Sequence, residues 1–213
     1  MEMNEKTRRI LMTVFGVLIC GFSVGMFDFS NLGVDPFQVF AHGVWLRTPL
    51  GFGTLYTIVN VIMLVAIFIL DKKKIGLGTL INIFLLGYVA EFSSNLWVKL
   101  IPEPTFGVKL AFLIVAIIIM CFASALYFTG DLGVSTYDAV ALMISEKQSK
   151  VKFQYIRIAT DLFCVVFGFV LGANFKAGYT GVGTIITAFF MGPLIAFFNK
   201  TVAIPLRYGK NHK

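Results

Sequence analysis

The sequence predicts an all-α membrane protein whose six transmembrane helices form two inverted three-helix repeats. Composition indicates the membrane class, because hydrophobic residues make up 58% of the 213 positions and charged residues only 14%. A typical soluble domain contains about 25% charged residues, and the mean hydropathy of +0.86 agrees with a membrane protein. Similarity between the two halves of the chain predicts the repeats.

Six apolar segments are long enough to cross a bilayer, which requires roughly 20 helical residues. They cover residues 10–27, 54–70, 77–98, 110–128, 155–171 and 182–198. We interpret the first segment as a retained helix, because it is long and contains no small-residue cleavage site of the kind that ends a signal peptide.

Basic residues predict the orientation of these segments, because cytoplasmic loops of membrane proteins are enriched in lysine and arginine. With the N-terminus in the cytoplasm, most basic residues fall on the cytoplasmic side, in the groups 6–9, 72–74, 147–157 and 200–213. Arg47, Lys99, Lys109 and Lys176 fall on the outer side. We therefore expect a multi-pass protein of the plasma membrane with both termini in the cytoplasm.

The net charge of +7 does not indicate a partner nucleic acid. The basic residues lie in short clusters at the ends of apolar segments and form no face interleaved with aromatic residues. His42 and His212 are too isolated to form a metal site, and the three cysteines fall within apolar segments. No nucleophile, base and orienting acid occur at a recognisable spacing. We expect neither an enzyme nor a protein with a metal or cofactor.

The two halves of the chain resemble each other in three places. Residues 31–41 (NLGVDPFQVFA) align with residues 131–141 (DLGVSTYDAVA), and Asn60 aligns with Asp161. Residues 76–92, which begin GLGT, align with residues 181–197, which begin GVGT. The matches occur in the same order, so we divide the chain into repeats at 1–105 and 106–213. Each repeat contains three crossings, an odd number, so the second must have the opposite orientation.

A second, shorter helix is predicted after the first span of each repeat. Asp35 is a favourable N-cap residue, and Pro36 suits the first helical position, where a missing backbone N–H costs nothing. In the second repeat Ser135 and Asp138 have the spacing of a capping box. Unpaired backbone N–H groups are costly in hydrocarbon, so we expect both amino ends to face a watery cavity. The alternative is that both helices lie flat at the membrane surface.

Polar residues inside apolar segments usually face the bundle interior or water. On this basis, and from the starts of the short helices, the candidate substrate-binding residues are Asp35, Gln38, Asn60, Glu91, Ser135, Asp138, Arg157 and Asp161. Arg157 and Asp161 lie four positions apart and have the alternative role of a structural ion pair. Asp138 has the alternative role of stabilising its helix N-terminus. Asp28, near the end of the first span, is expected at the membrane interface.

Two motifs resemble those of the YczE/YyaS/YitT group of bacterial integral membrane proteins, most closely its YczE-like branch. The first family motif reads approximately L-G-x-x-P-W-D; Leu32, Gly33 and Pro36 match it, whereas Phe37 and Gln38 replace the last two residues. The second motif, G-L-G-T-x-x-N, is matched at residues 76–82. The resemblance covers nearly the whole chain. It implies a bacterial membrane protein of a transporter-like class, with no substrate assigned.

We therefore expect a small-solute transporter that works by alternating access, with its site between the repeats. Its partners would be the lipid bilayer, a small-molecule substrate and, for concentrative transport, a proton or sodium ion; a homo-oligomer is compatible with the sequence. Three alternatives stay open: an aquaporin-like channel, the substrate-binding subunit of a vitamin uptake complex, and a membrane assembly or regulatory protein. For the last, Gly21 and Gly25 would form a contact face, with packing inside the chain as the competing interpretation.

Overall fold

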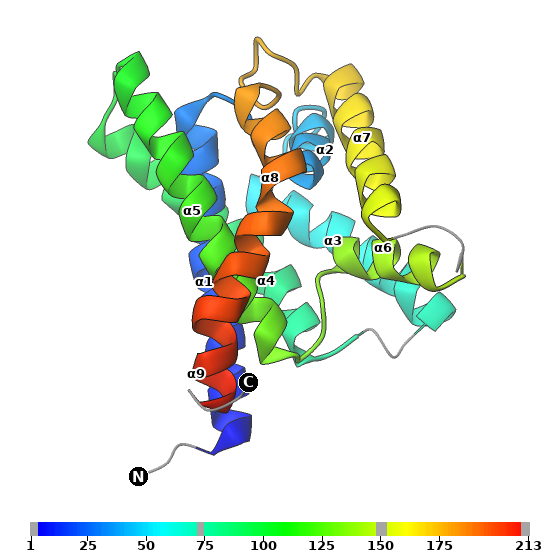
Figure 1. Cartoon of the computed structure of the whole chain (residues 1–213). Coiled ribbons are helices and arrows are strands. Elements are labelled where there is room, and N and C mark those ends of the chain that lie inside the picture. The colour runs from blue at the N-terminus through cyan, green and yellow to red at the C-terminus, as the bar shows by residue number, and fades with distance from the viewer. Residues whose placement is uncertain (1–3, 72–74, 148–152, 210–213) are drawn as a thin grey trace.

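The computed structural model describes residues 4–71, 75–147 and 153–209. Within these ranges the regular elements are helices (Figure 1). In chain order they are α1 Glu5–Ser30, α2 Pro36–Trp45, α3 Phe52–Asp71, α4 Leu77–Leu100, α5 Phe106–Gly130, α6 Thr136–Lys147, α7 Phe153–Leu171, α8 Val182–Phe198, a π-helical turn Asn199–Ala203, and α9 Ile204–Tyr208.

Five segments in the described ranges are helical, long and apolar enough to cross a membrane. They are α1, α3, α4, α5 and the continuous helical segment from α8 to α9. The sixth predicted span lies in α7, which is not among the five. The chain is therefore an all-helical membrane protein, and its sixth crossing stays a prediction.

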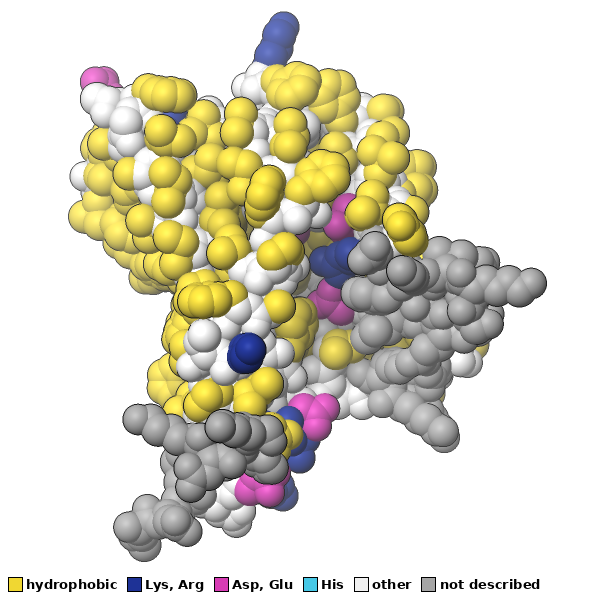
Figure 2. All heavy atoms as spheres, in the orientation of Figure 1, with side chains coloured by type: hydrophobic (Ala, Val, Ile, Leu, Met, Phe, Trp, Pro, Cys, Tyr) yellow, Lys and Arg dark blue, Asp and Glu magenta, His cyan; other side chains and the backbone are white. Residues whose placement is uncertain are grey.

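Large apolar side chains cover much of the outer surface (Figure 2). Ile69 is 75% exposed and Phe92 is 64% exposed, and many similar side chains lie along the long helices. Exposure of this much apolar surface to water would cost about 25 cal/mol per Å². A hydrocarbon environment removes that cost, in agreement with a membrane location.

Among the described helices, α1 packs most extensively on α4 and α5. Small residues permit the close approach to α4: a Cβ on Gly21 would lie 2.8 Å from the Leu86 carbonyl oxygen, and one on Gly25 would lie 2.5 Å from the Ser93 side chain. Gly21 and Gly25 therefore serve packing within the chain, and this face of α1 is not free for a partner.

The predicted short helices are present as α2 and α6. α2 begins at Pro36, and Oδ1 of Asp35 accepts the backbone N–H of Gln38 at 3.2 Å. α6 begins directly after Ser135, whose hydroxyl oxygen accepts the backbone N–H of Asp138 at 3.1 Å. Both helix starts therefore have the capping chemistry that the sequence predicts.

Each short helix packs on the other half of the chain, α2 on α7 and α6 on α3. Close approach of α2 to α7 depends on Gly168, where a Cβ would lie 2.3 Å from the Val39 carbonyl oxygen. The two short helices also contact each other, because the rings of Phe37 and Tyr137 stack with centroids 4.9 Å apart. The two halves are thus interlocked rather than merely adjacent.

The turns before the short helices have matching geometry. Gly33 has φ of +107° and Gly133 has φ of +106°, a backbone region that residues with a Cβ rarely adopt. Each turn packs on the glycine-rich start of a helix from the other half. The carbonyl of Leu32 accepts the N–H of Gly183 at 2.8 Å, and the carbonyl of Leu132 accepts the N–H of Gly78 at 2.6 Å.

Candidate functional site

A pocket of about 790 Å³ lies among the starts of the two short helices and the helices α5, α7 and α8. This volume is in the range of small-molecule sites, which is about 300–1,000 Å³. Figure 2 shows acidic and basic side chains in a recess part-way along the molecule, bordered by hydrophobic side chains. Among the described residues, the polar side chains that line the pocket are Asp35, Ser124, Asp138, Arg157, Asp161 and Thr187.

Arg157 joins the two acidic residues that the second half contributes to the pocket. Its Nη1 atom contacts Oδ1 of Asp138, and its Nε atom lies 3.3 Å from Oδ1 of Asp161. The hydroxyl of Tyr137 donates a hydrogen bond to the same Asp161 oxygen, and the Arg157 Cζ atom lies 4.5 Å from the Tyr137 ring centroid. The ion pair expected between Arg157 and Asp161 is thus present, with Asp138 as a second acidic partner.

Asp35 has no corresponding basic partner. One of its carboxylate oxygens accepts the backbone N–H of Gln38, and no Lys, Arg or His of the described ranges forms an ion pair with it. The described part of the pocket lining therefore contains three carboxylates, those of Asp35, Asp138 and Asp161, and one guanidinium, that of Arg157.

Three other predicted residues lie beside the pocket without lining it. The hydroxyl of Ser135 donates to Oδ2 of Asp138 at 2.6 Å and so orients that carboxylate. Asn60 accepts a hydrogen bond from the Thr136 hydroxyl and donates to the carbonyl of Tyr56 at 2.8 Å, which ties the start of α6 to α3. Gln38 is buried, and its Oε1 atom has no hydrogen-bond partner among the described residues.

Glu91 lies apart from the pocket. Its Oε2 atom accepts the backbone N–H of Gly53, at the start of α3, at a distance of 2.9 Å. A carboxylate in this position satisfies one of the free N–H groups of a helix N-terminus and interacts favourably with the helix dipole. The structure thus gives Glu91 a local role in fixing α3 against α4.

Sequence reasoning did not select Tyr137, although it holds Asp161 through its hydroxyl and Arg157 through its ring. The alignment of the repeats could have indicated it, because Tyr137 aligns with Phe37 and differs from it only by the hydroxyl group. A buried phenol usually finds a hydrogen-bond partner, so this addition pointed to a polar neighbour.

Asp28, which was expected at the membrane interface, is largely buried within the protein. Its side chain is only 11% exposed, and Oδ1 lies 2.9 Å from Nε2 of His42, a residue that sequence reasoning treated as isolated. Only residues 31–35 separate α1 from the short helix α2, and the turn that they form brings the two side chains together.

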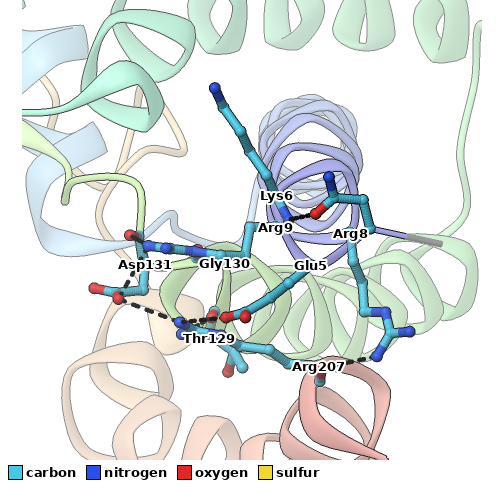
Figure 3. A network of polar contacts seen from close by, with 9 residues as sticks. Glu5, Lys6, Arg8, Arg9, Thr129, Gly130, Asp131 and Arg207 are labelled. Atoms are coloured by element: carbon cyan, nitrogen blue, oxygen red, sulfur yellow. Dashed lines mark hydrogen bonds and ion pairs between the residues drawn. The ribbon is translucent and has the colours of Figure 1, made fainter.

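A network of ionic and hydrogen-bonding contacts holds the turn that leads into α6 (Figure 3). Nε of Arg9 donates to the Gly130 carbonyl at 2.9 Å, and its Nη2 atom lies 3.1 Å from the Asp131 carboxylate. Nη1 of Arg207 donates to the Thr129 carbonyl at 2.7 Å, and its Nη2 atom lies 3.4 Å from the same carboxylate. The start of α1 and the short helix α9 are thereby joined to the turn between α5 and α6.

Comparison with known proteins places this architecture in a family. The model of the family described as "Family of unknown function (DUF6198)" matches residues 7–200, which include both short helices and the whole pocket. The chain belongs to this family. The DUF6198 match ends within the helical segment that follows α8.

Three relatives extend over most of the chain. An uncharacterized protein of Haemophilus influenzae is 26% identical over 197 residues, which cover 92% of this chain and 85% of the relative. The uncharacterized membrane protein YczE of Bacillus subtilis is 21% identical over 183 residues, which cover 85% of this chain and 81% of the relative. The uncharacterized protein YyaS of the same organism is 25% identical over 187 residues, which cover 86% of this chain and 88% of the relative. The predicted resemblance to the YczE and YyaS group is confirmed, and no solved structure matches the chain.

Proposed function

We propose that the protein is a small-solute carrier with six spans, in which two inverted three-helix repeats expose the pocket alternately to either side of the membrane. The observation that supports this proposal most is the polar pocket itself. Ionisable residues within membrane segments are costly, and they commonly mark the path of a solute or ion. Here four ionisable side chains line the described part of one pocket, and the membrane-length helices α5 and α8 form part of its wall.

Pairs of equivalent features support the inverted repeats. The αL residues Asn31 and Asp131 have φ of 55° and 52°, and each is followed two positions later by a glycine with positive φ. Each short helix lies against the other half of the chain, α2 on α7 and α6 on α3. Interlocked repeats with short helices near the midplane are typical of secondary transporters.

The surface of α7 supports the sixth span. Leu162 is 63% exposed and Val170 is 72% exposed, whereas Arg157 and Asp161 on the same helix line the pocket. A helix with apolar side chains outward and ionisable side chains inward is typical of a transmembrane segment beside a polar cavity. We place α7 across the membrane on this basis.

The network around Asp131 is a candidate closure at one end of such a carrier. The positive-inside pattern puts this end of the molecule in the cytoplasm. Opening the pocket to that side requires the turn before α6 to move, and the contacts of Arg9 and Arg207 oppose that movement. Carboxylates in the pocket would bind a coupling proton or sodium ion, and the protein is proposed to have no enzymatic activity.

Cysteine labelling tests the proposal without knowledge of the substrate. In a variant with Cys20, Cys121 and Cys164 replaced by alanine, Ser124→Cys places one thiol in the pocket lining. A membrane-impermeant thiol reagent is added to sealed vesicles of right-side-out or inside-out orientation. If the protein is a carrier, Ser124→Cys should be labelled from both sides. The vesicles contain only the purified protein, so no partner can account for the labelling.

Two control positions define the sides. Gly107→Cys, where no atom lies within 4 Å of an added Cβ, should react only from the outer side, and the exposed Lys200→Cys only from the inner side. Labelling of Ser124→Cys from one side alone contradicts the carrier and favours a receptor-like or assembly role. Faster osmotic shrinkage of proteoliposomes than of empty liposomes favours the aquaporin-like channel.

A further inference from the structure

The charges that line the pocket are unbalanced. Among the described residues that line it, three carboxylates face one guanidinium, so their ionised side chains sum to two negative charges. Arg157 is engaged by Asp138 and Asp161 together, and the Tyr137 hydroxyl supplies Asp161 with a further donor. Asp138 and Asp161 therefore already have hydrogen-bond donors within the protein and need none from a ligand.

The helix N-termini at the pocket are already occupied by protein oxygens. Helix N-termini attract anions through free N–H groups and the helix dipole. Here the Asp35 carboxylate accepts the N–H of Gln38, and the Ser135 hydroxyl accepts the N–H of Asp138. A negatively charged side chain thus lies at the start of each short helix, Asp35 at α2 and Asp138 at α6. These side chains would repel an anionic ligand.

Asp35 is the acidic residue of the pocket that forms no ion pair with a described basic side chain. Its Oδ1 atom is satisfied by the Gln38 N–H, whereas its Oδ2 atom receives no hydrogen bond from the described residues. A carboxylate in a low-dielectric surrounding is stabilised strongly by an opposite charge. A ligand with an ammonium group would supply that charge.

Apart from Ser124 and Thr187, the remaining described wall of the pocket is apolar. Phe128 comes from α5, and Phe189, Met191 and Ile195 come from α8. Aromatic faces attract organic cations, and apolar walls favour a ligand with a hydrocarbon body. Figure 2 shows hydrophobic side chains on the flank of the molecule beside the charged group, where such an amphipathic ligand would arrive from the bilayer.

We propose that the pocket binds a monovalent organic cation with an apolar body, and that the Asp35 carboxylate is its counter-ion. This inference rests on the proposed function, since it names the class of solute that the carrier moves. The ammonium group lies at the start of α2, and the apolar body lies against α8.

Three probes with the same apolar body and different charges test the class. They are 2-phenylethylammonium, 2-phenylethanol and phenylacetate, added near neutral pH to the purified full-length protein in detergent. Binding to the folded state raises the thermal midpoint, and titration of this shift gives an apparent dissociation constant. We expect the cation to raise the midpoint most, the alcohol less, and phenylacetate not at all.

Two variants assign the counter-ion. Asp35→Asn keeps an N-cap residue of similar strength, so α2 should still form. It should weaken binding of 2-phenylethylammonium by about tenfold or more, because it removes the charge but not the shape of the side chain. Glu103→Gln is the matched control, since Glu103 is exposed and lies outside the pocket lining, and it should leave the apparent constant unchanged.

Stabilisation by phenylacetate equal to that by the cation, no stabilisation by the cation, or equal binding in Asp35→Asn and the unaltered chain each overturn the inference. Its failure is distinct from failure of the carrier. Ser124→Cys labelled from both sides, together with any of these results, leaves the carrier in place and rejects only the cationic solute. Labelling from one side rejects the carrier whichever probe binds.

Discussion

The Nε2 atom of His42 lies 2.9 Å from Oδ1 of Asp28, inside the helical bundle. The imidazole ring also stacks between two aromatic rings, with its centroid 4.3 Å from that of Phe52 and 4.0 Å from that of Tyr179. Burial, and to a smaller extent the Asp28 carboxylate, raise the pKa of the Tyr179 phenol, which therefore stays protonated. His42 thus joins α2 to α1, α3 and the segment before α8.

His42→Ala should lower the free energy of unfolding by about 2–4 kcal/mol, because it removes a buried ring from between two others and leaves a cavity. His42→Phe, which keeps an aromatic ring between Phe52 and Tyr179, should recover most of the loss. Thermal unfolding in detergent measures both. An unchanged midpoint for His42→Ala would show that the stack does not stabilise the fold.

Gly33→Ala and Gly133→Ala should each destabilise the protein by about 1–3 kcal/mol. Both positions have positive φ, and an added Cβ would lie 2.7 Å from the Gly181 nitrogen in one case and 2.6 Å from the Gly76 nitrogen in the other. Gly107→Ala is the control, because nothing lies within 4 Å of its Cβ position and alanine favours a helix. If all three variants unfold at the same temperature, the turns are not under this constraint.

Arg157→Met should destabilise the pocket by leaving Asp138 and Asp161 near each other without a cation. The double variant Arg157→Met/Asp138→Asn should recover part of the loss, since only one charge then lacks its partner. A double-mutant cycle on thermal unfolding should give a coupling energy of about 0.5–3 kcal/mol. Additive effects would mean that the contact between Arg157 and Asp138 contributes little.

The network around Asp131 should depend more on Arg207 than on the acid. The Asp131 side chain is 67% exposed, so Asp131→Asn should cost less than about 1 kcal/mol, and high salt should reduce even this. The Arg207 side chain is 10% exposed and donates to the Thr129 carbonyl, so Arg207→Met should cost about 1–3 kcal/mol at any salt concentration. Unfolding at low and high salt compares them; a larger effect of Asp131→Asn contradicts this ranking.

Local sequence was enough to predict several starts of helices. Asp35 before Pro36, and Ser135 three positions before Asp138, specify helix caps through contacts within one turn. The apolar segments likewise predict the long helices, because hydrophobic length alone determines whether a helix can span a bilayer. The ion pair of Arg157 with Asp161 was also accessible, since residues four apart share a helix face.

Contacts between segments far apart in the chain could not be predicted from local sequence. Asp28 was expected at the membrane interface and Glu91 at the substrate site, yet one lies beside His42 and the other caps α3 at Gly53. The second acidic partner of Arg157 and the role of Tyr137 depend on how α6 lies against α7. No spacing within either helix specifies that arrangement.

The sequence by itself therefore determined the membrane class, the long helices and the capped starts of the short ones, because hydrophobic length and capping act within a few residues. Only the tertiary structure decided which carboxylates share the pocket and which of them Arg157 neutralises. That choice depends on the crossing of α2 with α7 and of α6 with α3. Such crossings are set by packing between distant segments, through side-chain shapes that act together rather than one position at a time.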